Sequence, residues 1–246
     1  MKHLSLLLIA GVVLAADPSF GQNQKAQQTN GQSSQAAASS RVTYTPPNRK
    51  TPGGRIGGST RGAVDHALTV EVLAPDDHIG WSATAQPTLY IYLSQAVTQP
   101  LEVTIDTDEL GKRHEPLLEV TLDQDQPAGI FPISLRDYKV RLAPEVIYRW
   151  SVAIITNPDQ RASDLIASGL IQYVPPPADF SRAVTHLQGN ARMRSYAERG
   201  YWYDAINAVS QGAGRQPDWR QQRADLLDQV HLPGPAASDR MADPKH

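Results

Sequence analysis

Apolar and polar residues alternate in short runs through the middle of the chain. Residues 101–106 and 148–154 show this period of two clearly, and such a period is typical of half-buried β-strands. Seven short strands favour an antiparallel β-sandwich, which we place at residues 63–177. The predicted strands are Leu68–Leu73, Pro87–Leu93, Leu101–Thr107, Glu115–Leu122, Gly129–Leu135, Ile147–Ile155 and Leu165–Val174.

The second of these strands differs from the others because it is apolar on both faces. Its sequence is Leu89-Tyr90-Ile91-Tyr92-Leu93. We therefore expect this strand to be central in its sheet, or to have its outer face covered by another element.

The hydrophobic period changes after residues 175–177, three consecutive prolines that cannot continue a hydrogen-bonded ladder. Phe180, Val184 and Leu187 share one helical face, and Asp179 is a candidate N-cap. The pattern predicts an α+β protein with a helical unit over 178–232 and a disordered tail over 233–246. Three further helices are expected, at Gly189 to about Arg199, about Tyr203 to Gln211, and Asp218 to Val230.

Residues 142–152 resemble the corner that opens a late strand of a fibronectin-type-III-like sandwich. The resemblance rests on the Leu-x-Pro-x-x-x-Tyr spacing of Leu142, Pro144 and Tyr148. In such sandwiches the tyrosine ring lies between the sheets, and its hydroxyl bonds the backbone a few residues upstream. The resemblance therefore implies an immunoglobulin- or fibronectin-like sandwich in which Tyr148 is buried.

The segment from Tyr196 to Pro217 resembles a single tetratricopeptide-type helical hairpin. Gly200 stands at the tight turn between the two helices, Ala205 at their crossing, and Pro217 at the start of the next helix. Stacked arrays of this repeat normally need three or more copies. Because this chain has one, the resemblance implies a cap that packs on the sandwich rather than a peptide-binding superhelix.

The N-terminus has the three parts of a secretory signal peptide. Lys2 and His3 precede the apolar run Leu4–Leu14, and small residues follow that run. The run is too short to span a bilayer, and no later segment is apolar enough to do so. We expect a periplasmic or secreted protein. The signal is assigned to residues 1–21, with cleavage after Ala15, Ala16 or Gly21.

Residues 22–62 show no pattern of a packed core. Gln22–Ser40 is almost entirely Gln, Asn, Ser, Ala and Thr, which predicts a disordered spacer. Residues 41–62 hold basic but no acidic side chains, whereas 63–177 hold more than twice as many acidic as basic ones. The basic arm is expected to bind an anionic surface polymer or lipid headgroups, to fold back on the acidic sandwich, or to serve only as a linker.

The composition excludes several classes of function. The chain contains no Cys, so disulfides, thiol nucleophiles and thiolate metal sites are absent. The Gly-rich stretch Gly53–Gly62 could cradle phosphate, but it lacks the Lys-Ser/Thr ending of a P-loop and follows no predicted strand. We expect no nucleotide cofactor and no nucleic-acid partner.

No group of residues has the spacing of a known catalytic or metal site. The His residues form no H-x-x-H pair, and no G-x-S-x-G motif occurs. Asp76-Asp77-His78 could ligate a metal, and residues 106–111 superficially resemble a calcium loop, but Leu117 replaces its bidentate Glu. Both stretches are better interpreted as turns. We predict a non-enzymatic protein without catalytic residues, metal or cofactor.

Aromatic residues beside an arginine form the candidate binding site. Tyr201, Trp202 and Tyr203 follow Arg199 closely, and these residue types dominate interface hot spots. Consecutive helical residues point in different directions, so at least one of the three is expected to pack against the sandwich instead. The basic arm adds two further candidate binding residues, Arg55 and Arg61.

Four short motifs follow one another along the chain: Gly57–Gly62, Leu73–Gly80, Tyr148–Val152 and Tyr201–Ala205. Together they resemble an uncharacterised bacterial family of secreted proteins, the domain-of-unknown-function family 928, over about residues 42–232. The resemblance implies no catalytic residues. We expect a non-enzymatic interaction or assembly module of the bacterial envelope, whose partner is an envelope protein or an anionic surface polymer and whose sandwich edge accepts a partner strand.

A carbohydrate-binding or carbohydrate-processing accessory protein is the alternative. Exposed aromatic and acidic side chains along one face of the sandwich would favour it. The sequence leaves the oligomeric state open.

Overall fold

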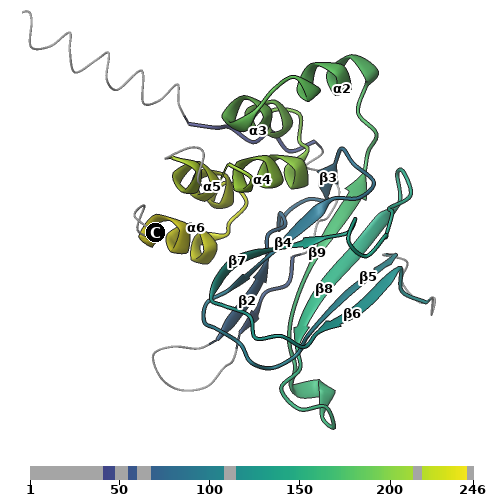
Figure 1. Ribbon diagram of the computed structural model, residues 1–246, viewed down its shortest axis with the longest axis vertical. Coiled ribbons are helices and arrows are strands. Elements are labelled where there is room, and N and C mark those ends of the chain that lie inside the picture. The colour runs from purple at the N-terminus through teal and green to yellow at the C-terminus, as the bar shows by residue number, and fades with distance from the viewer. Residues whose placement is uncertain (1–40, 48–54, 60–67, 108–114, 213–217, 243–246) are drawn as a thin grey trace, which may run out of the picture. The chain divides into compact units, whose positions relative to one another are not determined.

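The computed structural model of the chain is shown in Figure 1. The chain divides into two units, Met1–Arg41 and Val42–His246, and the fold described here belongs to the second. The predicted signal peptide and spacer, and the predicted binding residue Arg61, lie outside the described residues. The structure describes residues 41–47, 55–59, 68–107, 115–212 and 218–242.

All seven predicted strands are confirmed. They precede the helices in the chain, so the protein has the α+β class that the pattern predicted. Their bounds are β2 Thr69–Val72, β4 Thr88–Leu93, β5 Leu101–Thr107, β6 Leu118–Leu122, β7 Gly129–Ser134, β8 Ile147–Ile154 and β9 Leu165–Tyr173.

Two short strands were not predicted, β1 (Gly58–Ser59) and β3 (Gly80–Ser82). Neither is long enough to show a period, and glycine is a weak strand former. β1 pairs with β2, while Ile56 exchanges two backbone hydrogen bonds of 2.8 Å with Ser168 of β9. Residues 56–59 therefore cross from one sheet to the other, which corrects the prediction of an irregular arm for this stretch.

The strands form two sheets that enclose one core (Figure 1). Their orders are β1-β2-β4-β7 and β3-β9-β8-β5-β6, and all neighbours are antiparallel except β3 and β9. We call them together the two-sheet body. Its central apolar side chains are essentially inaccessible to solvent: Val70, Val72, Leu89, Ile91 and Leu93 from one sheet and Leu101, Val103, Ile105, Trp150, Val152 and Ile154 from the other.

Tyr148 occupies the buried position that the resemblance to a fibronectin-type-III corner implied. The residue is 6% exposed, and its hydroxyl accepts a hydrogen bond of 3.2 Å from the backbone N–H of Ala143. Glu145, inside the same corner, has a positive φ of 63° and donates its N–H to the Tyr173 carbonyl at the end of β9. The corner thus anchors the start of β8 to its neighbouring strand.

The four predicted helices are confirmed, and a fifth follows them; we call the five together the helical unit. Asp179 lies in the first turn of α2, but the N-cap is Pro177, which corrects the predicted cap. None of the described helices is long and apolar enough to cross a membrane. The bounds are α2 Ala178–Thr185, α3 Gly189–Ala197, α4 Trp202–Ser210, α5 Trp219–Asp228 and α6 Pro233–Met241.

The prediction of a disordered tail is wrong for residues 233–241, which form α6. The proline at the start of α6 suits a first helical turn, where no N–H partner is needed. Arg223 of α5 holds Asp239 of α6 through two hydrogen bonds of 2.7 and 2.6 Å, and both residues are almost fully buried. The sequence pattern missed α6 because this pairing joins residues far apart in the chain.

The helices cover the outer face of β4, as its two apolar faces predicted. The Tyr90 hydroxyl donates to Asn207 Oδ1 of α4 at 3.1 Å. Tyr92 lies close to Gly234 of α6, where an added Cβ would stand 3.8 Å from its ring. In Figure 1 the helices α4 to α6 accordingly lie beside the sheet that contains β4.

Candidate functional site

Two of the predicted binding residues fill the seam between the helical unit and the two-sheet body. Trp202 is 0% exposed, and its indole N–H donates to the Leu73 carbonyl at 2.8 Å. The Tyr203 hydroxyl donates to the Leu170 carbonyl and accepts from the indole of Trp150, both at 2.9 Å. Each polar atom of these aromatic side chains therefore has a partner inside the protein.

The seam is also closed sterically. A Cβ added to Gly80 of β3 would lie 2.7 Å from the Tyr203 ring, so only glycine fits there. Burial raises the pKa of Tyr203 and keeps its hydroxyl neutral. The structure corrects the prediction of Trp202 and Tyr203 as binding residues, because both are core residues that attach the helices to the sheets.

Tyr201 belongs to a smaller aromatic cluster with Phe180 and Tyr196. Its ring stacks on Phe180 at 5.7 Å between centroids, and Tyr201 is only 4% exposed. The Arg199 guanidinium lies over the Phe180 ring, 4.4 Å from its centroid, and forms a cation–π contact. Of the four aromatic and basic candidates in this stretch, Arg199 is the one that the structure places at the surface.

Asp204 lies at the first turn of α4 beside this cluster. Its carboxylate accepts a hydrogen bond of 2.6 Å from the backbone N–H of Ala83. Burial raises the pKa of Asp204 to about 7, although the hydrogen bonds from Ala83 and the Ser82 side chain counteract the rise. Sequence reasoning missed this residue, since nothing in its pattern shows that a loop of the sheet covers it.

Asp77, His78 and Tyr44 form a polar chain that runs from an exposed carboxylate to a buried imidazole and a buried phenol. The Tyr44 hydroxyl lies 2.7 Å from His78 Nε2, and His78 Nδ1 lies 2.6 Å from Asp77 Oδ1. A carboxylate, an imidazole and a hydroxyl in this order also occur in acyl-transfer enzymes. Here the hydroxyl belongs to a phenol that is shielded by the ring of Trp202 at 5.0 Å, and burial raises the pKa of Tyr44 further. The chain thus anchors the buried Tyr44 side chain to His78.

Asp76, Asp77 and His78 lie in a bend of the backbone just before β3. Asp76 contacts His231, whose Nδ1 lies 3.1 Å from its carboxylate. Within the described ranges no three His, Asp or Glu side chains converge as metal ligands. The second candidate turn, at 106–111, lies partly outside the described residues.

Arg55 links the segment after β2 to the residues that follow α5. Its guanidinium donates to the carbonyls of Ala74 at 3.0 Å, Val230 at 3.0 Å and His231 at 2.7 Å. The last two carbonyls follow the C-terminal end of α5, where a cation is favourable. Burial lowers the pKa of Arg55, and the nearby Asp76 carboxylate counteracts this. The structure thus corrects the prediction that Arg55 binds an external anion.

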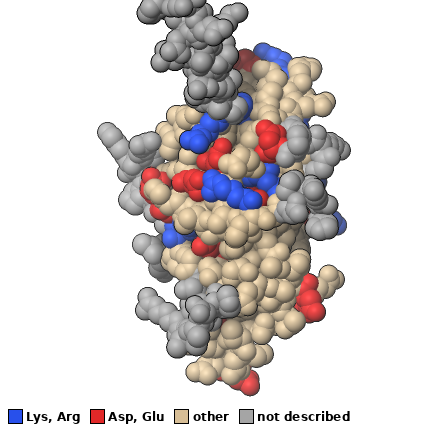
Figure 2. Space-filling view, turned by 90° about the vertical axis from the view of Figure 1, so that its left-hand side faces the viewer, with Lys and Arg blue, Asp and Glu red and all other residues tan. Residues whose placement is uncertain are grey.

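The face drawn in Figure 2, the left-hand side of Figure 1, carries charges of both signs side by side. On the helices, Arg240 of α6 donates to Asp228 of α5 at 2.5 Å. The charged side chains gather in one band, and the area below it is largely uncharged. Among the described residues drawn on this face, positive and negative side chains are mixed.

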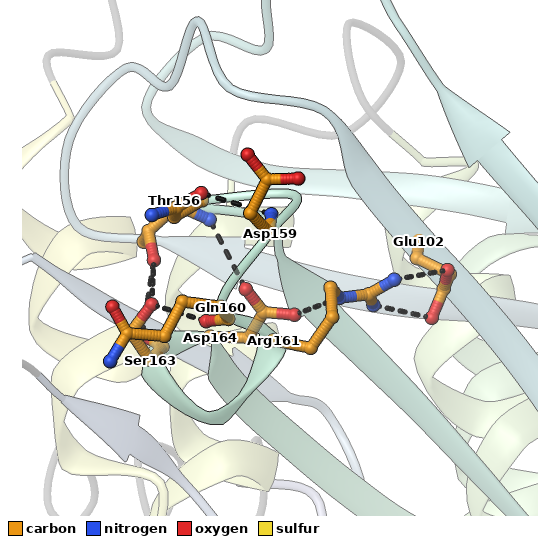
Figure 3. A network of polar contacts seen from close by, with 8 residues as sticks. Glu102, Thr156, Asp159, Gln160, Arg161, Ser163 and Asp164 are labelled. Carbon is orange, nitrogen blue, oxygen red and sulfur yellow. Dashed lines mark hydrogen bonds and ion pairs between the residues drawn. The ribbon is translucent and has the colours of Figure 1, made fainter.

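The turn between β8 and β9 contains a compact polar network, which Figure 3 shows. It includes the short 3-10 helix η1 (Arg161–Ser163). Arg161 donates to both oxygens of Glu102 on β5, at 2.9 and 3.3 Å, and to Asp164 at 2.5 Å. The hydrogen bonds of Glu102 and Asp164 raise the pKa of Arg161. The network holds the turn in one conformation, so its polar groups are engaged within the chain.

β6 is the longest proline-free strand at the edge of a sheet. It pairs with β5 and, within the described residues, with no other strand. Its Glu119 and Thr121 side chains are exposed, and Leu117, just before it, is 39% exposed. The corresponding edge strand of the other sheet, β7, carries an exposed Pro132 without an N–H. The free backbone of β6 is the most regular one that the described surface offers.

A protein-family model described as Domain of Unknown Function (DUF928) matches residues 56–239. The chain belongs to this family. The DUF928 domain thus includes both sheets from Ile56 onward and the helices as far as Asp239. No curated protein matches the chain.

The boundaries of the DUF928 domain separate two groups of residues. The seam, the β8–β9 turn and β6 lie inside it, whereas Tyr44 and the segment around it precede it. Tyr44 nevertheless contacts His78 and Trp202 within the domain. No spacing signal in the sequence connects residues so far apart.

Proposed function

We propose that this protein is a non-enzymatic, extracytoplasmic interaction module of the bacterial envelope. The observation that carries the proposal is the free edge of β6, since an unpaired strand edge recognises an extended segment through backbone hydrogen bonds. The DUF928 family membership names no activity and is compatible with such a role.

The chemistry around β6 indicates which segment would bind. Residues 115–126 contain four acidic side chains and no Lys or Arg. Glu119 and Thr121 point to solvent, and Val120 between them is partly buried against the core. An added strand would therefore place basic residues beside Glu119 and apolar residues over Val120, in the alternation that strand pairing imposes. We propose an envelope protein with such a segment as partner.

The state of the other polar candidates supports a non-enzymatic role. The Tyr203 hydroxyl, the Asp204 carboxylate and the Arg55 guanidinium each bond a backbone group of a neighbouring element. Such contacts hold elements together. They leave the surfaces as the part of the molecule available to a partner.

We also infer that the two-sheet body is related to the fibronectin type III sandwich. Counting β2 as the first of the seven long strands, the first, second and fifth share one sheet, and the others share the second. The fourth strand, β6, pairs with the third instead of the fifth, unlike immunoglobulin constant domains. The Tyr148 corner gives independent support.

Within the helical unit, α3 and α4 are proposed to form one tetratricopeptide-like hairpin that serves as a cap. Gly200 between α3 and α4 has a φ of +80°, a backbone conformation that glycine favours at helix ends. Ala205 at the predicted crossing is 0% exposed. These are the positions on which the resemblance rests.

The extracytoplasmic location rests on the signal pattern of residues 1–21. Expression of the full chain in a bacterial host should yield a mature protein in the periplasm or the medium. Mass spectrometry of its N-terminus should find it shortened after Ala15, Ala16 or Gly21. An unprocessed protein that stays in the cytoplasm would refute the location.

The β6 edge is tested by site-specific crosslinking. A photo-crosslinking amino acid replaces Thr121 in one variant and Asp159, an exposed residue of the β8–β9 turn, in the other. Irradiation in the envelope of the source bacterium should give an adduct for position 121 only. Glu119→Lys added to the Thr121 variant should abolish that adduct, because it introduces a repelling charge at the edge.

Equal adducts at positions 121 and 159, or none at 121, would contradict the proposed edge. The Asp159 variant controls for random encounters, since both positions are exposed on the same body.

The carbohydrate alternative has less support. The most exposed large hydrophobic side chains among the described residues are Ile56, Leu117, Ile166 and Met241, and none is aromatic. A stacking platform for sugar rings calls for exposed aromatic side chains. A glycan array probed with the mature protein would test it directly.

A further inference from the structure

The segment Val42–Pro47 lies extended along the helical unit. It forms neither helix nor strand, and in Figure 1 it runs as the purple stretch past α3. Val42 and Tyr44 are buried, at 1% and 6% exposure, whereas Thr43 and Thr45 are exposed. This alternation is that of an extended peptide with one side against a protein surface.

A side-chain amide holds the backbone of this segment. Gln229, just after α5, accepts from the Tyr44 N–H at 2.8 Å and donates to the Val42 carbonyl at 3.1 Å. The same amide nitrogen donates to the Asp225 carbonyl at 2.7 Å, which fixes its orientation. The Gln229 amide thus binds backbone groups of Val42 and Tyr44, and these contacts do not depend on the side chains of the segment.

A second backbone contact comes from α3. The Thr45 N–H donates to the Ala197 carbonyl at 3.0 Å. Gly200 beyond it allows close approach, since an added Cβ would lie 2.8 Å from Pro47 Cδ and 3.0 Å from the Thr45 carbonyl oxygen. The last turn of α3 is therefore shaped for this backbone.

The Tyr44 side chain supplies the specificity. Its ring meets the edge of Trp202 at 5.0 Å and stacks on His78 at 5.5 Å between centroids. Its hydroxyl lies 2.7 Å from His78 Nε2 and 3.5 Å from the Gly200 carbonyl. A phenylalanine would fill the space but leave His78 without this partner.

The segment and the residues that hold it belong to different parts of the chain. His78, Ala197, Trp202 and Gln229 lie within the DUF928 domain, which begins at residue 56, and Val42–Pro47 precede it. The domain thus carries a peptide groove, and the occupant is an appended stretch.

We propose that this groove, formed by α3, α4, His78 and Gln229, is a peptide-binding site that exchanges Val42–Pro47 between two copies of the chain. The segment within the same chain is the resident ligand. A second copy offers an identical segment, so exchange conserves every contact described above and joins the two copies. The site is separate from the β6 edge and does not depend on it.

Complementation between two full-length variants tests the exchange. Tyr44→Ser removes the anchor from the segment and leaves the groove intact. His78→Phe/Gln229→Ala weakens the groove and leaves the segment intact. Each variant alone should sediment as a single-chain species in analytical ultracentrifugation, and the mixture should form a 1:1 heterodimer.

A synthetic peptide of residues 41–47 should dissociate the heterodimer. The same peptide with serine at the tyrosine position should compete roughly tenfold more weakly or worse, since a buried aromatic anchor is lost. Glu119→Lys, introduced into both variants, should leave the heterodimer unchanged. This control separates a failure of the groove from a failure of the β6 proposal.

Absence of a heterodimer between variants that are folded by circular dichroism would overturn the proposal. So would binding of the peptide to the Tyr44→Ser variant without any heterodimer, because the occupant would then not be a second copy. If Tyr44→Ser does not fold, Thr45→Pro replaces it, since this change deletes the N–H that bonds Ala197 and restricts the backbone of the segment, while the Tyr44 side chain is kept.

Discussion

Single polar side chains fix loops of this protein to its strands and helices. The Asp204 carboxylate bonds the Ala83 N–H, and the Tyr148 hydroxyl bonds the Ala143 N–H. The role of Tyr148 was implied by the resemblance to a fibronectin-type-III corner, a local motif in which the partner lies five residues upstream. The role of Asp204 was not, because its partner lies on another element. At this scale the sequence reveals a contact only where both partners are close in the chain.

The raised pKa of Asp204 predicts a specific pH dependence of stability. The folded protein favours the protonated carboxyl up to about pH 7, whereas the unfolded chain releases this proton near the ordinary pKa of about 4. Between these pH values the folded state binds more protons, so this group lowers the free energy of unfolding as pH rises. Asp204→Asn should remove that loss.

Urea denaturation at several pH values measures the effect. The stability difference between Asp204→Asn and the wild type should grow in favour of the variant from pH 4 to pH 7. Asp159→Asn, which removes a carboxylate from an exposed turn, is the control and should not reproduce the slope. A difference that is independent of pH would refute the assignment.

Tyr148→Phe isolates the hydroxyl of the corner. The ring stays between the sheets, but the Ala143 N–H loses its partner, which should cost about 1 kcal/mol of folding free energy. Chemical denaturation of the two proteins measures this. An unchanged midpoint would mean that water replaces the hydroxyl at no cost.

At the scale of elements, the strands and helices with a clear period were predictable and the others were not. β5 and β8 alternate regularly, so their positions follow from the sequence. β1 and β3 are shorter than a period can show, and their pairing comes from β2 and β9. α6 lacks an apolar stripe in the sequence and depends on an ion pair with α5.

The Arg223–Asp239 pair is expected to hold α6 in place. Asp239→Asn leaves the buried Arg223 without its counter-charge, which should destabilise the protein by about 3–5 kcal/mol. The double variant Arg223→Met/Asp239→Leu should cost clearly less, since no buried charge remains. Denaturant midpoints and the loss of helical circular dichroism measure both.

Arg240→Met serves as the control for this element. Its pair with Asp228 is substantially exposed, so its removal should cost no more than about 1 kcal/mol. A larger loss than for Asp239→Asn would contradict the role of the buried pair.

At the scale of the whole molecule, the two-sheet body and the helical unit share one core. Trp202 and Leu226 of the helices belong to the same buried cluster as Leu89 and Trp150 of the sheets. A shared core couples the two parts energetically. The helical unit is therefore a part of one folding unit rather than an independent domain. Tyr44 belongs to the same buried cluster and so to the same folding unit.

A single unfolding transition follows from that core. Tryptophan fluorescence reports on all four tryptophans, which include Trp150 and Trp202 in the seam, and far-UV circular dichroism reports on helices and strands together. The two signals should give the same midpoint in urea. Separate midpoints would show that the helices detach from the sheets before these unfold.

The sequence by itself determined the α+β class, seven strands and four helices, because each rests on periodicity within a few residues, and its resemblance to a fibronectin-type-III corner indicated the buried Tyr148. Only the tertiary structure decided that Trp202 and Tyr203 are core residues, that Arg55 bonds backbone carbonyls of distant segments and that Val42–Pro47 occupy a groove. These outcomes depend on which distant segments meet. A local pattern states what a side chain prefers, and the packing of the whole chain determines which surface satisfies that preference.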